Sequence, residues 1–60
     1  MEELKDMCLR FRAKNRLTQR QMAAMCGVDR TVIISIEKGR SVYALAAEKV
    51  KIVLEGEKND

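Results

Sequence analysis

The segment from Gln19 to Ile36 (QRQMAAMCGVDRTVIISI) constrains the fold of this 60-residue chain more than any other. Its apolar residues recur at helical spacing on both sides of Gly27. Glycine suits a tight turn because it adopts positive φ without steric cost. Ala23 provides a small side chain where two helices must approach closely. The segment therefore predicts two short helices joined by a turn at Gly27.

Residues that favour helix ends support this interpretation. Thr18 is a predicted N-cap, and Gln21 three residues later completes a capping box. Asp29 is predicted to cap the second helix, which spans about Arg30 to Lys38. Residues 32–34 are β-branched and are also compatible with a strand. The capping residue before them and the glycine after them favour a helix.

Two further helices are predicted on either side of this pair. Glu2 to Lys14 has apolar residues three and four apart, and Asn15 is expected to end that helix in the left-handed conformation. Ser41 to Glu55 keeps the helical period, either as one long helix or as two short ones. Gly56 is expected to stop it, leaving residues 57–60 as a frayed tail.

These segments predict an all-α fold, a compact bundle of four to five short helices in one domain over residues 1–56. A chain of this length buries only about 60% of its unfolded surface, which leaves little room for a catalytic pocket. The apolar positions expected in the core are Leu4, Met7 or Cys8, Phe11, Leu17, Met22, Ala23, Cys26, Val32 or Ile33, Ile36, Val42, Leu45 or Ala46, Val50, and Val53 or Leu54.

The distribution of charge favours a polyanionic partner. The net charge is +3, but residues 10–40 contain eight Lys and Arg against two acids, a net charge of +6. Such asymmetry is typical of a chain that binds nucleic acid. A generic solvated surface is the alternative that charge alone leaves open.

Composition argues against several classes of protein. Cys8 and Cys26 lack CxxC spacing and no histidine is present, so no metal site is predicted and both thiols are expected to be buried and reduced. Phe11 and Tyr43 are the only aromatic residues, which disfavours readers of single strands by base stacking. No catalytic constellation, cofactor motif or small-molecule site is evident. No secretory signal or membrane-spanning run is present, so a cytoplasmic protein is expected.

The segment from Cys8 to about Arg40 resembles the lambda-repressor-like, Cro-type helix-turn-helix family, often called Xre. The elements that carry the resemblance are Arg12, Leu17-Thr18-Gln19, Met22-Ala23, Gly27-Val28, Ile33, Ile36-Glu37 and Lys38-Gly39-Arg40. Family members usually continue with a Pro-containing loop and two further helices. Here the corresponding GRSVYALAAEKVKIVLEG is shorter and has no proline.

The second helix of such a pair enters the major groove of DNA with its N-terminal residues at the base edges. The predicted base-contacting residues, on the face opposite Ile33 and Ile36, are Arg30, Thr31, Ile34 and Ser35. Arg30 suits a bidentate pair with guanine, while Thr31 and Ser35 suit a base or a phosphate. Ile34 suits a thymine methyl group, with a second-layer core position or a protein contact as alternatives.

The predicted phosphate-contacting residues are Gln19, Arg20, Lys38, Arg40 and Arg16. The resemblance implies that Gln19 binds phosphate through its side chain and the amides at the helix N-terminus, where an anion is favoured. Simple helix capping is the alternative. The resemblance further implies an ion pair between Arg12 and Glu37. A structural role for that pair is favoured over a role in orienting DNA contacts.

The sequence therefore predicts a transcriptional regulator of bacterial or phage type that binds double-stranded DNA. A repressor is favoured, acting as a homodimer whose recognition helices lie about 34 Å apart on a pseudo-palindromic operator. The alternative is a protein-interaction module of the same fold, such as an antitoxin or an assembly adaptor. A domain of a longer protein is also compatible with the sequence.

Overall fold

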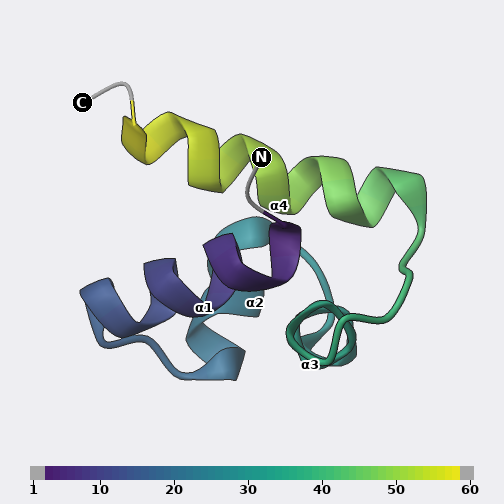
Figure 1. Ribbon diagram of the computed structural model, residues 1–60, viewed down its shortest axis with the longest axis horizontal. Helices are drawn as coiled ribbons and strands as arrows, with labels where there is room; N and C mark the ends of the chain where they lie inside the picture. Colours follow the sequence, from purple (N-terminus) through teal and green to yellow (C-terminus); the bar gives the residue numbers. More distant parts are fainter. Residues whose placement is uncertain (1–2, 59–60) are drawn as a thin grey trace.

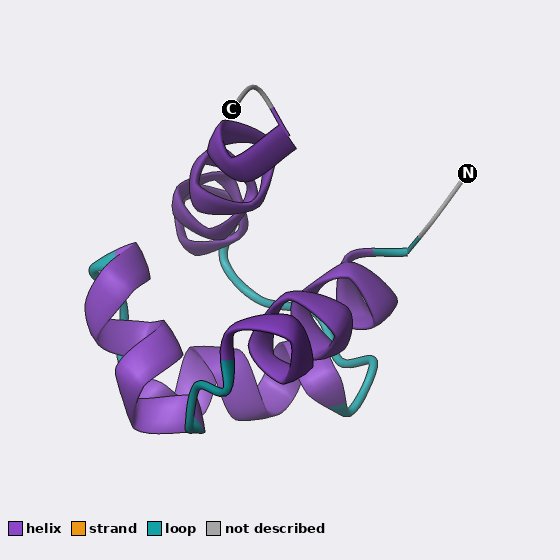
Figure 2. Cartoon of the chain, turned by 90° about the vertical axis from the view of Figure 1, so that its left-hand side faces the viewer, coloured by secondary structure: helices purple, strands orange, loops and turns teal. Residues whose placement is uncertain are grey.

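The computed structural model describes residues 3–58, which form four α-helices and no strand (Figures 1 and 2). The helices are α1 Leu4–Asn15, α2 Gln19–Cys26, α3 Arg30–Glu37 and α4 Ala44–Lys58. Helix α3 packs against α1 and α2, and α4 lies across the same two helices on the other side. The expected all-α bundle is confirmed, with four helices.

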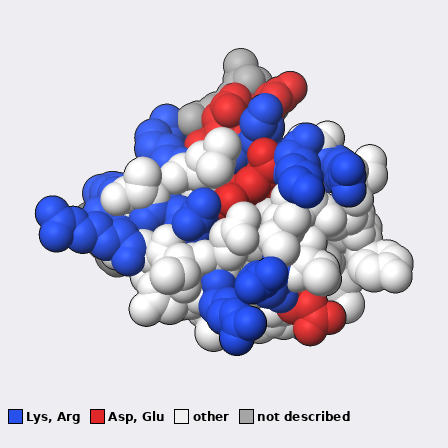
Figure 3. All heavy atoms as spheres, turned by 90° about the horizontal axis from the view of Figure 1, so that it is seen from below, with Lys and Arg blue, Asp and Glu red and all other residues white. Residues whose placement is uncertain are grey.

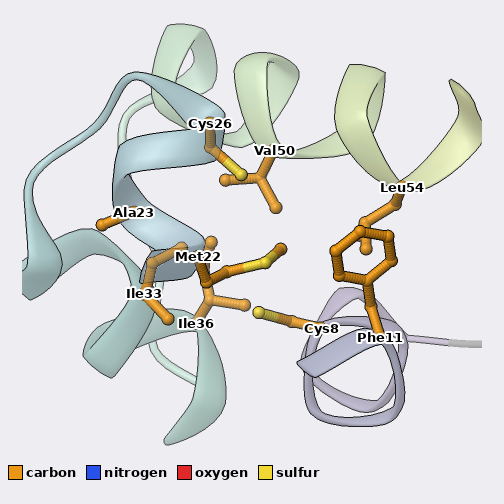
Figure 4. Close-up of a cluster of buried hydrophobic side chains, with 9 residues drawn as sticks. All are labelled: Cys8, Phe11, Met22, Ala23, Cys26, Ile33, Ile36, Val50 and Leu54. Atoms are coloured by element: carbon orange, nitrogen blue, oxygen red, sulfur yellow. The ribbon is translucent and has the colours of Figure 1, made fainter. Parts of the chain in front are cut away.

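The core lies where the four helices meet (Figure 4). Met22 of α2 is fully buried among side chains of the other helices. Phe11 of α1 faces Leu54 of α4 on one side of the cluster. The buried hydrophobic residues are Cys8, Phe11, Met22, Ala23, Cys26, Ile33, Ile36, Ala46, Val50 and Leu54. At four positions the sequence left two candidates for the core, and the buried residue of each pair is Cys8, Ile33, Ala46 and Leu54. Leu45, the other candidate beside Ala46, is 69% exposed.

The predicted ends of α2 are confirmed. The Thr18 side chain accepts a hydrogen bond from the Gln21 amide at 3.1 Å, and the Gln21 side chain accepts one from the Thr18 amide at 2.8 Å. Gly27 ends the helix with φ 71°. Because this capping box and turn fix both ends of α2, the start of α3 is held close to it.

Helix α3 differs slightly from the prediction at both ends. Asp29 occupies the N-cap position, but its side chain makes no capping hydrogen bond. The helix ends at Glu37, one residue earlier than expected, and Lys38 is its C-cap. Gly39 follows with φ 77°, and the amide of Arg40 donates to the carbonyl of Ser35 at 2.9 Å.

Replacing Gly39 by alanine is expected to lower the free energy of unfolding by about 1 kcal/mol, because positive φ is costly for a residue with a Cβ. The added Cβ would lie 3.8 Å from Lys5 Cδ, an ordinary contact, so the cost comes from the backbone. Urea denaturation measures the change. Gly56→Ala, inside α4 with open space around the added Cβ, should instead stabilise the protein. Equal effects of the two substitutions would contradict the backbone explanation.

The predicted end of α1 is wrong by one residue. Asn15 is the last helical residue, and its side-chain amide donates to the carbonyl of Phe11 at 2.9 Å. Arg16, with φ 54°, adopts the left-handed conformation instead. The amide of Leu17 then donates to the carbonyl of Arg12 at 2.9 Å, which closes the helix end. The predicted start at Glu2 lies outside the described residues.

The predicted limits of the last helix are also wrong. Helix α4 is a single helix that begins at Ala44 rather than Ser41 and continues through Gly56 to Lys58. Glycine lowers helix stability by about 1 kcal/mol without forbidding the helix, and the buried side chains of α4 outweigh that cost. Of the expected frayed tail, residues 57 and 58 are therefore helical, and residues 59 and 60 lie outside the described part of the chain.

Candidate nucleic-acid interface

The solvent-facing side of α3 carries all four residues predicted to contact bases. Arg30 and Thr31 in its first turn are exposed, while Ile34 and Ser35 are half-buried. The helical period places the four on one side, opposite the two buried isoleucines of α3. Ile34 belongs neither to the core cluster nor to the partly buried residues packed against it. The helix thus presents a mixed polar and apolar face to a ligand.

The Glu37 carboxylate at the end of α3 is bound by side chains from both preceding helices. Arg12 donates from Nε to Oε2 at 2.8 Å and from Nη2 to Oε1 at 3.0 Å, the bidentate geometry of a strong ion pair. Gln19 donates from Nε2 to Oε1 at 3.1 Å, and the Cys8 thiol lies 3.5 Å from Oε2. The predicted ion pair of Arg12 and Glu37 is therefore present in the structure.

This pair also ties the turn after α1 to α3. Arg12 Nη1 donates to the carbonyl of Leu17 at 3.0 Å, so one guanidinium group bridges that turn and the Glu37 carboxylate. The Glu37 side chain is 6% exposed and that of Arg12 is 26% exposed. The carboxylate is thus shielded from water, and its hydrogen bonds hold the C-terminal end of α3 at a fixed position relative to α1 and α2.

Acid is expected to weaken the fold through Glu37. Burial raises the pKa of this carboxyl, but hydrogen bonds from Arg12 and Gln19 and the charge of Arg12 outweigh it and lower the pKa below its ordinary 4.5. The ionised form therefore stabilises the folded state above pH 4.5, and this contribution is lost as the pH falls through the lowered folded pKa. Urea denaturation at a series of pH values measures the loss.

The Glu37→Gln variant is the control for this pH dependence, since its side chain does not titrate. Its free energy of unfolding should decrease less steeply below pH 4.5 than that of the wild type. Parallel curves for the two proteins would show that other carboxyl groups cause the acid sensitivity.

The residues predicted to contact phosphate are distributed over three segments around α3. Arg16, Arg20, Lys38 and Arg40 are all exposed. Gln19 is half-buried, and its side chain is hydrogen-bonded to Glu37, a partner that the sequence did not indicate. Figure 3 shows several separate groups of Lys and Arg atoms on the side of the molecule away from α4, with uncharged surface and some Asp and Glu atoms between them. Separate cationic groups suit contacts to phosphates flanking a groove.

Tyr43 is a further residue beside this face that the sequence prediction missed. It is 83% exposed and lines, together with Thr31 and Ser35, a groove of about 390 Å³ between α3 and the segment leading to α4. An aromatic residue shortly after the predicted recognition helix was the available signal. Whether Tyr43 lies beside α3 depends on the path of the loop that follows the helix, and the sequence did not specify that path.

Residues 3–58 contain no group of three or more side chains placed to bind a metal ion. Within the same range, no helix has the length and apolar character needed to cross a membrane.

Comparison with known proteins identifies the family. The model of the helix-turn-helix family HTH_3 matches residues 9–55, which cover α2, α3 and most of α1 and α4. The match extends past Arg40, where the resemblance seen in the sequence ended. Searches of curated proteins and of solved structures found no significant match. The chain therefore belongs to the HTH_3 family of Cro-type, Xre-like helix-turn-helix domains, whose function is to bind DNA.

Proposed function

We propose that this protein is a transcriptional regulator that recognises a specific double-stranded DNA sequence and represses transcription by occupying a pseudo-palindromic operator as a dimer. The observation that supports this most is the construction of α3. Its buried side is fixed by two isoleucines and its end by Glu37, whereas Arg30 and Thr31 are exposed in its first turn. A rigidly held helix with a free polar first turn suits reading base edges in the major groove.

The proposed contacts divide into two classes. Arg30, Thr31, Ile34 and Ser35 face the bases, where the guanidinium fork of Arg30 pairs with a guanine and Ile34 contacts a thymine methyl group. The residues proposed to bind phosphates, which position the helix without reading sequence, are Gln19, Arg16, Arg20, Lys38 and Arg40. Since Gln19 also donates to Glu37, its phosphate contact would connect the DNA backbone to the group that holds α3.

The dimensions of the domain are compatible with a dimer on one face of the duplex. The molecule measures 27 × 24 × 18 Å. Adjacent half-sites of a pseudo-palindrome lie about 34 Å apart, one turn of the double helix. Two copies placed side by side fit this spacing, with one recognition helix in each of two successive major grooves.

Selection of bound duplexes from a random DNA pool tests the proposal. We expect enrichment of a two-fold symmetric motif and an affinity that decreases steeply with salt, with a slope of about −0.9 for each phosphate contact. Enrichment of an asymmetric motif would contradict the dimer but not DNA recognition. If no DNA motif were enriched and the affinity for DNA did not change with salt, sequence-specific recognition would be contradicted. That result would favour a protein-interaction module of the same fold.

A further inference from the structure

An open groove of about 720 Å³ separates the turn between α2 and α3 from the start of α4. Its apolar lining includes Val28 and Val32, which are half-buried and pack against the core from outside. Both valines therefore leave part of their surface uncovered within the groove. The groove lies on the α4 side of α3, next to the face proposed to read bases.

Two large side chains line the same groove but remain mostly in solvent. Tyr43 is 83% and Leu45 is 69% exposed. A hollow with protruding apolar side chains on its own edge can serve both halves of a symmetric interface. In a two-fold dimer the same patch occurs on both subunits, so a protrusion on one must fit a hollow on the other.

The charges along the groove have the same self-complementary character. Asp29 lies at its α3 side and Lys49 at its α4 side, and both are exposed. A two-fold axis parallel to the groove exchanges the two sides, and with that axis each aspartate faces the lysine of the other copy. Opposite charges at such paired positions fix the register of an interface and disfavour partners that lack them.

We propose that this groove is the dimer interface, with Tyr43 and Leu45 of each copy placed over Val28 and Val32 of the other and Asp29 paired with Lys49 across the two-fold axis. The occupant of the groove is a second copy of this chain. The inference rests on the proposed function, because it specifies how the two recognition helices of the regulator are held together.

This position links dimerisation to DNA reading. Tyr43 and Val32 also line the neighbouring groove that contains Thr31 and Ser35. The dimer interface therefore begins at the edge of the face that meets the bases. A change in the packing around Tyr43 should alter the separation of the two α3 helices as well as the dimer affinity.

Charge reversal tests the two-fold pairing in the free, full-length protein. We expect Asp29→Lys and Lys49→Asp each to weaken the dimer about tenfold, because each places like charges opposite one another. The double variant D29K/K49D should restore the dimer. An equimolar mixture of the two single variants should form heterodimers, since both charge pairs are then complementary. Sedimentation equilibrium measures these affinities.

One control variant and one check of folding accompany the charge reversals. Lys51→Asp makes the same change in charge on a different side of α4, where Lys51 is exposed and does not line the groove, and it should leave the dimer unchanged. Circular dichroism of each variant verifies that the helices form, which matters for Asp29 because it occupies the N-cap position of α3. A folded D29K variant that dimerises like the wild type would overturn the proposed pairing.

A second pair of variants tests the apolar contacts. Leu45→Ser removes a side chain of the groove, whereas Ile52→Ser removes an exposed side chain of the same helix, 61% exposed, outside it. We expect about tenfold weaker dimerisation for the first and no change for the second. The reverse order would place the interface on the outer side of α4 and overturn the proposal.

The outcomes separate this inference from the proposed function. A dimer that follows these rules but binds no duplex would leave the interface in place and contradict the regulatory function. A protein that selects a DNA motif yet binds each half-site as an independent monomer would overturn the interface alone. Loss of DNA affinity in L45S with an unchanged dimer would reassign the groove to DNA contact.

Discussion

Arg12→Met is expected to lower the free energy of unfolding by about 3 kcal/mol, because it leaves the Glu37 carboxylate without its bidentate partner in a site that is 6% exposed. A domain of this size has a total stability of only about 3–9 kcal/mol. The midpoint of thermal unfolding should therefore fall by about 15 °C. Thermal and urea denaturation followed by circular dichroism measure both quantities.

Two further variants distinguish the loss of the ion pair from the loss of the side-chain volume. Arg12→Lys keeps the positive charge but cannot make the bidentate contact, so its stability should lie between that of the wild type and that of R12M. The double variant R12M/E37L removes both charges and should be more stable than R12M alone. If the double variant were the less stable of the two, the unpaired Glu37 carboxylate would not account for the loss of stability in R12M.

Arg30→Ala is expected to reduce affinity for the selected DNA motif by about 10- to 100-fold while changing affinity for unrelated duplexes much less. A bidentate contact with guanine contributes about 1–3 kcal/mol of discrimination. The same substitution should broaden the base preference at one position of each half-site. Binding titrations against the selected motif and its single-base variants measure this discrimination directly.

Arg40→Ala is the matched comparison, since it also removes one exposed arginine near an end of α3. We expect it to weaken binding to all duplexes alike and to reduce the magnitude of the salt slope by about 0.9. If R30A and R40A lost the same discrimination between motif and unrelated DNA, the division into base-contacting and phosphate-contacting residues would be wrong.

The central helix pair was predictable because its signals are local. Thr18 and Gln21 form their capping box within four residues, and Gly27 adopts the positive φ that its lack of a side chain permits. Ile33 and Ile36 are buried as their spacing indicated. Each of these features depends on residues close in sequence, so neither the path of α4 nor any distant contact was needed to infer them.

The errors arose where neighbouring residues compete or where distant helices decide. Asn15 and Arg16 are both candidates for the left-handed position, and the side-chain bond from Asn15 to the Phe11 carbonyl keeps Asn15 helical. Gly56 signals a helix end, yet α4 continues past it. Glu37 illustrates the influence of distant helices, since Gln19 and Cys8 reach its carboxylate from 18 and 29 residues away in the sequence.

The two buried thiols allow transient opening of the native protein to be measured. Burial and the nearby Glu37 charge raise the pKa of Cys8 to about 12, and burial raises that of Cys26. Alkylating reagents react with the thiolate, so at neutral pH neither cysteine should be modified until the helices separate. The rate of alkylation therefore measures how often the native molecule exposes its interior, without added dye or denaturant.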